Sequence, residues 1–333
     1  MFRIFQRTLI LISILMFQPN LVYSQVLYLD KQFDFTRTSE KFASKPVFGP
    51  GNSIGGNIDL YLELFTPDGP NVPFKNPLMI LIHGGGFKSG TRFSQDLIEI
   101  CEDMAQRGWV CTSIDYRLLG DRPIIGDEIT NTEWWPTLLP PTEEEIGVTA
   151  ASEDALAAYR WLIMNSDSLS IDTEKIVIGG SSAGSATAIN VGYFLDDLGL
   201  LQKNDIDAVY DRWGSLVLDT DFIQEDDPPI FIVHGDADTT KPVSEAFNIR
   251  DKVEGENVLY EMHIVPGAGH GFDVFTTLSD DGEPLHEHFL NFLYINVINE
   301  QPEAQNLPML NNIGVLALGL SMLGLGAVRL RKG

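Results

Sequence analysis

Basic residues, cysteines and long hydrophobic runs are all scarce in this chain of 333 residues. Lysine and arginine together number 22, against 47 aspartates and glutamates, so the formal net charge is −25. Such a charge repels phosphate backbones, and we therefore exclude nucleic acid as a principal partner. Hydrophobic residues make up 44% of the chain, charged residues 21%, and no internal repeat is visible. This composition excludes the collagen-like, low-complexity and disordered classes and fits a folded globular protein.

Only two cysteines are present, Cys101 and Cys111. Neither lies in a motif typical of a catalytic cysteine. A predicted helix that ends near Gly108, followed by a strand over 109–114, could bring Cys111 back beside Cys101. Two alternatives stay open, namely a disulfide, as is common in exported proteins, or two buried free thiols.

No uncharged hydrophobic run reaches the roughly 20 residues that a membrane-spanning helix usually needs. The run near the start, Leu9–Phe17, follows Arg3 and Arg7 and is followed by the small residue Ser24. This order of basic, hydrophobic and small residues predicts a secretory signal peptide over residues 1–24, rather than a short membrane anchor. We therefore expect the protein to be exported, with the export machinery as a transient partner.

A second run, 313–328, carries no charge and precedes a cluster of basic residues at the end of the chain. Glycines interrupt this run and a polar linker over 299–306 comes before it, which disfavours a buried core helix. The segment 307–333, which begins Leu307-Pro308-Met309-Leu310, resembles the exosortase-type C-terminal sorting tails of Gram-negative bacteria. This resemblance implies transient membrane anchoring, a membrane sorting protease as partner, and a location in the periplasm, at the cell surface or outside the cell.

Between these ends, hydrophobic patterns typical of strands and helices alternate. Strands are predicted over 58–65, 78–82, 109–114, 175–178, 230–233 and 261–265, and helices over 94–106, 143–165, 183–195 and 284–298. Strands separated by helices indicate βαβ units and a mainly parallel sheet, with an antiparallel pair near the start. We expect one α/β domain over residues 25–298.

One glycine-flanked serine motif lies between a predicted strand and a predicted helix. Gly180-Ser181-Ser182-Ala183-Gly184 follows strand 175–178 and leads into helix 183–195. A serine on such a tight turn is exposed at the end of the sheet, and the flanking glycines leave space for the backbone. The pattern predicts Ser182 as a nucleophile, whereas Ser181 is its non-catalytic neighbour.

A glycine-rich loop follows strand 78–82. In His83-Gly84-Gly85-Gly86, consecutive glycines leave backbone N–H groups uncovered, so that they can stabilise a developing oxyanion. We interpret His83 as a structural histidine that holds this loop, because a better candidate for the base exists.

The last two predicted strands lead into loops that carry an acid and a base. His234-Gly235-Asp236-Ala237-Asp238 follows the first, and Gly267-Ala268-Gly269-His270 follows the second. A serine hydroxyl becomes a good nucleophile when an imidazole takes its proton, and a carboxylate orients that imidazole. Ser182, Asp238 and His270 supply these groups in the order Ser, Asp, His. The alternative is that Asp238 and His270 are only turn-forming loop residues.

With these motifs, residues 57–298 resemble the exported α/β hydrolases of the carboxylesterase and hormone-sensitive-lipase-like group. The resemblance implies the α/β-hydrolase fold, with a mainly parallel central sheet and helices on both faces. It also implies the following roles: Ser182 as nucleophile, His270 as base, Asp238 as acid, Gly85, Gly86 and Ala183 as oxyanion donors, Asp236 as a loop-orienting residue and 115–118 as a structural segment.

The function implied is hydrolysis of carboxylic esters through an acyl-enzyme, without a metal or other cofactor. The substrate would be a small or polymer-linked ester, with short acyl or aryl groups such as the acetyl or feruloyl groups of polysaccharides. Activity is expected to fall below about pH 6.5, where an ordinary imidazole takes up a proton. Two alternatives remain: a serine peptidase of the same fold, whose members generally lack the glycine-rich loop, and a non-catalytic surface adhesion protein.

Two further features have less specific interpretations. Residues 119–141, which include Trp134 and Trp135, could form a flap over the site or a surface loop that covers the sheet edge. His286 and His288 are two residues apart on a predicted helix, so they point to different faces, which argues against a metal pair.

Overall fold

The computed structural model describes residues 26–135, 140–218 and 222–299. The predicted signal peptide, 1–24, and the predicted sorting tail, 307–333, lie outside the described residues. Contacts group the chain up to Ile298 into one compact unit. Within the described ranges, no helix has the length and hydrophobicity needed to cross a membrane.

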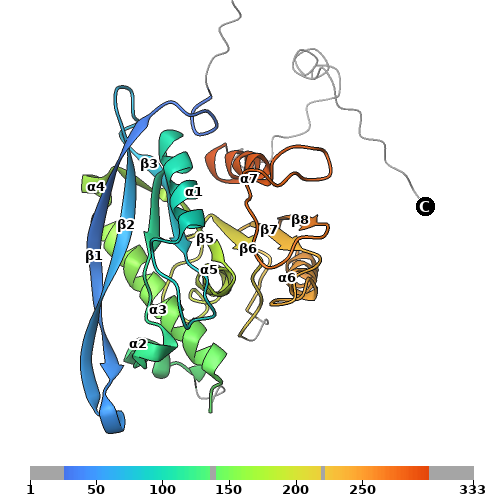
Figure 1. Cartoon of the computed structure of the whole chain (residues 1–333). Helices are drawn as coiled ribbons and strands as arrows, with labels where there is room; N and C mark the ends of the chain where they lie inside the picture. Colours follow the sequence, from blue (N-terminus) through green and yellow to red (C-terminus); the bar gives the residue numbers. More distant parts are fainter. Residues whose placement is uncertain (1–25, 136–139, 219–221, 300–333) are drawn as a thin grey trace, which may run out of the picture. The chain divides into compact units, whose positions relative to one another are not determined.

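Eight strands form one sheet in the order β1-β2-β4-β3-β5-β6-β7-β8 (Figure 1). The β1–β2 and β2–β4 pairs are antiparallel, and the remaining neighbours are parallel. The mainly parallel sheet with antiparallel strands near the start is therefore confirmed. The strands are β1 Asp34–Phe48, β2 Ile54–Asp68, β3 Asn76–Ile82, β4 Val110–Ile114, β5 Ile171–Ser181, β6 Ala208–Arg212, β7 Ile230–Gly235 and β8 Tyr260–Val265.

Helices cover both faces of this sheet, as expected. Helices α3, α5 and α6 pack on one face, and α1 and α7 pack on the other. Strand β3 shows why its sequence is continuously hydrophobic, since Leu78 and Ile80 contact the first layer while Met79 and Leu81 contact the second. The helices are α1 Gln95–Gln106, α2 Asp127–Thr130, α3 Glu143–Met164, α4 Ser166–Leu169, α5 Ala183–Tyr193, α6 Ser244–Gly255 and α7 Leu285–Leu293, which continues as a π-helical turn, Tyr294–Ile298.

The sequence did not predict β1, β6 and α6, nor the one-turn helices α2 and α4. In β1, Phe42 is the one buried residue, so this edge strand has no hydrophobic alternation to detect. Strand β6 has five residues, and its buried Asp211 and Arg212 interrupt the hydrophobic pattern. Helix α6 buries Ala246, Ile249 and Val253 and is otherwise polar or partly exposed. In each case the tertiary pairing, rather than the local pattern, determines the element.

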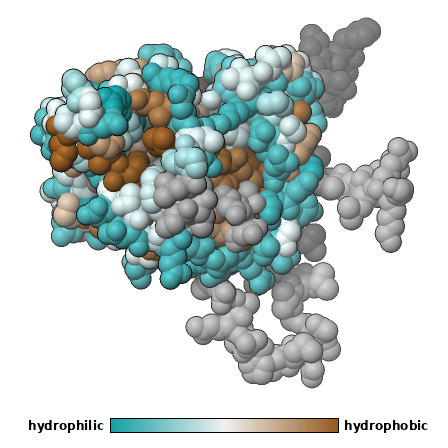
Figure 2. All heavy atoms as spheres, turned by 90° about the horizontal axis from the view of Figure 1, so that it is seen from below, coloured by the Kyte–Doolittle hydropathy of each residue, from teal (hydrophilic) through white to brown (hydrophobic). Residues whose placement is uncertain are grey.

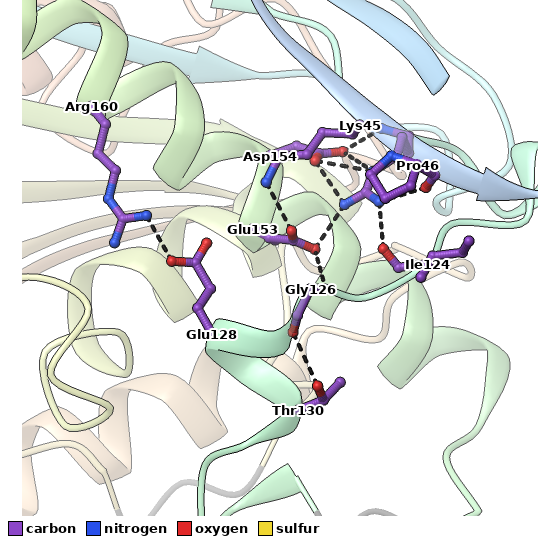
Figure 3. Close-up of polar contacts among 10 residues, drawn as sticks. Lys45, Pro46, Ile124, Gly126, Glu128, Thr130, Glu153, Asp154 and Arg160 are labelled. Carbon is purple, nitrogen blue, oxygen red and sulfur yellow. Dashed lines mark hydrogen bonds and ion pairs between the residues drawn. The ribbon is translucent and has the colours of Figure 1, made fainter. Parts of the chain in front are cut away.

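The segment 115–118 after β4 makes structural contacts, which agrees with the role expected for it. The Arg117 guanidinium is buried and contacts Asp154 at 2.8 Å and Glu153 at 2.8 Å, both on α3. Lys45 of β1 binds the second oxygen of Glu153 at 2.8 Å. Figure 3 shows Glu153 and Asp154 turned toward Lys45 and Pro46. This network joins α3 to the β1 edge of the sheet.

Most of the face seen in Figure 2 is hydrophilic, with two areas of hydrophobic side chains. Among the described residues, the most exposed large hydrophobic side chains are Phe74 at 84% and Ile54 at 78%. Single exposed side chains of this kind are ordinary on folded proteins.

Candidate active site

Ser182 lies on a sharp turn between β5 and α5. Its backbone angles, φ 54° and ψ −117°, are rare for a residue with a side chain. A Cβ atom on Gly180 would lie 2.4 Å from the carbonyl carbon of Gly184, and one on Gly184 would lie 2.0 Å from the Ile82 oxygen. Both glycines are therefore needed for this close packing, which presents Ser182 at the carboxyl end of β5.

A continuous chain of hydrogen bonds links Ser182, His270 and Asp238. His270 Nε2 lies 2.9 Å from Ser182 Oγ, and His270 Nδ1 lies 2.7 Å from Asp238 Oδ2. The residues come from the ends of three strands, because Ser182 follows β5, Asp238 follows β7 and His270 follows β8. Carboxyl ends of parallel strands meet at one edge of a sheet, where ligands of open α/β sheets bind. The fold thus brings together the three residues that the sequence predicted.

Asp238 is held as an ionised acceptor. Burial opposes ionisation, but hydrogen bonds from His270 and from the backbone N–H groups of Lys241 and Thr240 outweigh it and lower the pKa of Asp238. These two N–H groups donate to Asp238 Oδ1 at 2.9 Å and 2.8 Å, which leaves Oδ2 for His270. A carboxylate fixed in this way sets the Nδ1–H tautomer of the imidazole and orients its Nε2 toward the serine.

Asp236 and His234 support the loops on which the acid and base lie. Asp236 Oδ1 accepts a hydrogen bond from the Gly267 N–H at 2.6 Å, so it connects the acid loop to the histidine loop. His234 is buried, and its Nε2 lies 2.8 Å from the Lys241 carbonyl oxygen and 3.3 Å from Asp238 Oδ2. Sequence reasoning gave Asp236 this role but missed His234, whose signal is its position at the start of the His-Gly-x-x-Asp pattern.

The glycine-rich loop packs directly against the serine turn. A Cβ on Gly84 would lie 2.8 Å from the Ser181 oxygen and 3.2 Å from Ser182 Cβ. Gly85 and Gly86 have φ values of 117° and 59°, and a Cβ on Gly85 would lie 2.0 Å from the Ser89 oxygen. These conformations favour glycine and leave the N–H groups of the loop beside the serine.

Ala183 is the first residue of α5, whose N-terminal N–H groups have no partner within the helix. The backbone beside Ser182 therefore offers donors from two directions, the glycine-rich loop and the start of α5. This arrangement suits an oxyanion that forms at the serine.

His83 makes the contacts of a structural histidine. Its Nδ1 lies 2.7 Å from the Gly84 oxygen, and its ring stacks on Tyr116 with the ring centroids 4.3 Å apart. The Tyr116 hydroxyl donates to the His83 carbonyl oxygen at 3.1 Å. Burial lowers the pKa of His83, so this side chain is neutral and holds the loop.

A cavity of about 570 Å³ opens at Ser182. Two ion pairs border it, Lys88–Glu143 at 2.8 Å and Lys241–Glu144 at 2.6 Å. Its lining residues are Gly86, Phe87, Lys88, Leu119, Thr142, Glu143, Glu144, Ser182, Ala183, Ala186, Ser215 and Lys241. The cavity thus joins a partly hydrophobic floor to a charged rim.

The insertion over 119–141 contributes Leu119 to this cavity. Trp134 packs against Phe194 at the end of α5, with ring centroids 4.6 Å apart, and against Trp135 at 6.2 Å. Trp134 also packs against the core cluster on the α3 and α5 side of the sheet, and it is not among the residues that line the cavity at Ser182.

Cys101 on α1 and Cys111 on β4 form a disulfide in the structure, with their Cα atoms 5.0 Å apart. Both side chains are fully buried beneath α1. The sequence left open a disulfide or two buried free thiols, and the structure contains the disulfide.

Three family models match successive parts of the chain. Residues 62–127 match the model described as BD-FAE. Residues 145–210 match the model of the alpha/beta hydrolase fold, and residues 203–293 match that of the Prolyl oligopeptidase family.

Curated relatives are similar over shorter stretches. Esterase LipC of Mycobacterium tuberculosis is 22% identical over 240 residues, which cover 60% of this chain and 53% of that protein. Lipase 2 of Moraxella sp. is 34% identical over 33% of this chain and 20% of its own length. Ethyl acetate hydrolase of Pseudomonas putida is 28% identical over 39% of this chain and 33% of its own length. The chain thus matches about half or less of each of these relatives.

Solved structures share the fold at low sequence identity. The native form of the esterase Est2 from Thermogutta terrifontis aligns with a TM-score of 0.55 and 20% identity, over 80% of this chain and 95% of that one. MGS-M1, an alpha/beta hydrolase enzyme from a deep-sea metagenome library, aligns with a TM-score of 0.54 and 16% identity, over 80% and 98%. Together with the sheet, these likenesses show that the chain has the α/β-hydrolase fold, and the relatives that it matches are named esterases, a lipase and an ethyl acetate hydrolase.

Proposed function

We propose that this chain is a serine carboxylesterase that hydrolyses esters through an acyl-enzyme. The observation that carries the proposal is the hydrogen-bond chain from Ser182 Oγ through His270 to Asp238, with the glycine-rich loop packed beside it. This set of groups is what nucleophilic acyl transfer requires, namely an activated nucleophile, an oriented base and oxyanion donors.

In the first step, Ser182 Oγ attacks the ester carbonyl carbon while His270 Nε2 takes the serine proton. The N–H groups of Gly85, Gly86 and Ala183 stabilise the oxyanion, and His270 then gives its proton to the leaving alcohol. In the second step, water attacks the acyl-enzyme and His270 takes the proton of the water. The acid departs when His270 returns a proton to Ser182 Oγ.

The test is hydrolysis of p-nitrophenyl acetate and butyrate by the full chain and by two matched variants. Ser182→Ala should lower kcat by about 10⁶-fold, because the nucleophile is lost. Ser181→Ala removes the neighbouring hydroxyl and should leave kcat within a few-fold of the unmodified protein. An organophosphate should add covalently to Ser182, as detected by peptide mass spectrometry.

A folded protein without turnover on a broad panel of esters would overturn the enzyme proposal and favour the adhesion protein. Equal losses in the two variants would instead place the nucleophile elsewhere.

We further propose short acyl or aryl esters carried on a polar alcohol, such as a polysaccharide, as the substrate class. The charged rim, with Lys88, Glu143, Glu144 and Lys241 beside the cavity, supports this choice because such side chains bind hydroxyl groups of the alcohol part. Release of acetate or ferulate from esterified polysaccharide should be faster than hydrolysis of p-nitrophenyl palmitate. A preference for the long-chain ester would contradict this assignment.

A second candidate function is peptide hydrolysis, since residues 203–293 match the Prolyl oligopeptidase family. The glycine-rich loop over 84–86 supports the esterase, because peptidases of this fold generally lack it. Aminoacyl p-nitroanilides distinguish the two: the peptidase would cleave them at a kcat/KM above that for p-nitrophenyl butyrate.

We also propose that the protein is exported, with residues 1–24 removed and 307–333 acting as a sorting tail. The order of basic, hydrophobic and small residues at the start supports export, and so does the Cys101–Cys111 disulfide, because disulfides persist outside the cytosol. N-terminal sequencing of the protein from a fractionated Gram-negative host should begin near residue 25. An intact start on cytosolic protein would contradict the proposal.

A further inference from the structure

Three side chains with metal-binding atoms meet where the edge strand β8 contacts α7. Glu261 and His263 lie two residues apart on β8 and therefore share one face of the strand. His288 joins them from α7, and one ligand atom of each residue lies within 4.8 Å of the other two. Glu261 Oε1 is 2.8 Å from His263 Nε2 and 3.6 Å from His288 Nδ1.

The cluster is separate from the candidate active site. Within the described part of the chain, the cavity of about 280 Å³ that His263 and His288 line shares no lining residue with the cavity at Ser182. His286, two residues before His288, instead turns into the core and bonds Asp103 at 2.7 Å. His286 and His288 thus point to different faces of α7, and His288 contacts Glu261 of β8.

Two neighbouring groups hold His288 in the orientation of a ligand. Its Nε2 lies 2.8 Å from Ser279 Oγ and 3.1 Å from Asp281 Oδ1. Because a carboxylate only accepts hydrogen bonds, this contact places the proton on Nε2 and leaves the Nδ1 lone pair directed toward Glu261. A histidine whose far nitrogen donates to a carboxylate is the arrangement usual for metal-bound imidazole.

His288 Nδ1 and Glu261 Oε1 face each other as two acceptors, an arrangement that a cation bound between them would stabilise. Their separation of 3.6 Å is close to the roughly 3.4 Å between ligands of a tetrahedral ion with bonds of about 2.05 Å. The shorter distance from Glu261 to His263, 2.8 Å, is that of a hydrogen bond whose proton an ion would replace.

We propose that Glu261, His263 and His288 bind a divalent transition-metal ion, with Zn²⁺ as the preferred one and Asp281 as a positioning residue. Two imidazoles and a single carboxylate suit Zn²⁺ and its neighbours, whereas Ca²⁺ takes six to eight oxygen ligands and Mg²⁺ a near-octahedral oxygen shell. His263 and His288 line the cavity of about 280 Å³, from which a water molecule would complete the coordination of the ion. The three side chains are 37%, 18% and 20% exposed, so an ion reaches them from solvent.

Such an ion connects β8 to α7 across the segment between them, 266–284, which carries His270 near its start. Because the ligands come together in the folded chain, binding stabilises the fold and restrains this segment. The proposal does not depend on the proposed acyl transfer, and its ion takes no part in that reaction.

The test is calorimetric titration of ZnCl₂ into the full chain, produced without a histidine tag and freed of metal with a chelator that is then removed. We expect one ion per chain and a thermal midpoint that rises with zinc concentration. His263→Ala and His288→Ala should each weaken binding by at least about 100-fold. Asp281→Asn should weaken it by about 10- to 100-fold, because it only orients His288.

Glu254→Gln, which changes an exposed carboxylate on α6, is the matched control and should bind as the unmodified chain does. Glu261→Gln keeps the size of the side chain and should also lose binding, so the test does not rest on alanine variants that could fail to fold. Circular dichroism checks the fold of every variant.

Three results of the zinc titration would overturn the proposal. They are the absence of zinc binding up to millimolar concentration, equal binding by the His288→Ala variant, and binding that is lost in His270→Ala but kept in His263→Ala. The last result would place the ion at the Ser182, His270 and Asp238 site. Tighter binding of Ca²⁺ than of Zn²⁺ would also contradict it.

Discussion

Asp238 and Asp236 lie two residues apart in the turn after β7, and the structure gives their carboxylates different partners. Asp238 bonds the imidazole of His270, whereas Asp236 bonds the backbone of Gly267. The two residues therefore offer a matched pair of substitutions that separates orientation of the base from support of the loop.

Asp238→Asn should lower kcat on p-nitrophenyl acetate by about 10³–10⁴-fold, because an amide stabilises the wrong tautomer of His270 and no longer balances its positive charge. Asp236→Asn keeps the loop contact with Gly267 in part and should cost less than about tenfold. Steady-state kinetics on both variants, with thermal unfolding as a check of folding, measures the difference. A larger loss of kcat in Asp236→Asn than in Asp238→Asn would show that Asp236, and not Asp238, is the acid that orients His270.

At the scale of elements, a buried carboxylate connects two helices on one face of the sheet. Asp103 of α1 bonds Arg107, the residue after the end of α1, at 2.7 Å and His286 of α7 at 2.7 Å. Lys31, which precedes β1, contacts its second oxygen at 2.7 Å. Burial opposes the ionisation of Asp103, but the hydrogen bonds from His286 and Arg107 outweigh it and lower its pKa below the ordinary value.

Asp103→Asn should destabilise the fold by about 3 kcal/mol near neutral pH, because it leaves the buried Arg107 with only Glu287, 3.7 Å away, as a counter-charge. A depressed pKa stabilises the fold above the unfolded pKa of about 3.9 and loses this effect as the pH falls through the lower folded value. The difference from the unmodified chain should therefore shrink below about pH 4. Urea unfolding as a function of pH measures it.

The control for this experiment is Glu99→Gln, which changes an exposed carboxylate on the same helix and should alter the free energy of unfolding by less than about 0.5 kcal/mol. If the difference in the free energy of unfolding between Asp103→Asn and the unmodified chain did not change with pH, the ion pairs of Asp103 would not be its cause.

The sequence predicted the elements that are marked by a pattern within their own residues. Strand β3 is hydrophobic throughout because both of its faces are covered, and the serine turn is marked by glycines that close packing requires. Strand β1 is mostly exposed and is held in the sheet by its pairing with β2, and His234 contacts the carbonyl oxygen of Lys241, seven residues later, so neither is marked by a local hydrophobic pattern. The cluster of Glu261, His263 and His288 depends on how α7 packs on β8, which no local pattern contains.

At the scale of the whole molecule, one covalent link joins the face covered by α1 to the centre of the sheet. Cys101 lies on α1 and Cys111 on β4, which stands between β2 and β3. The bridge closes a segment of 10 residues and so restricts the unfolded chain. Loop-closure entropy for a segment of this size corresponds to roughly 2.7 kcal/mol.

The double variant Cys101→Ala with Cys111→Ala should therefore lower the free energy of unfolding by about 2–4 kcal/mol, since the lost crosslink adds to two small changes in the core. Its kcat should stay within about twofold of that of the unmodified chain, because neither residue lines the cavity at Ser182. Urea unfolding and ester hydrolysis measure the two quantities, and peptide mapping without reductant should recover Cys101 linked to Cys111. Recovery of both thiols free from exported protein would contradict the bridge, and an unchanged unfolding curve would show that it contributes no stability.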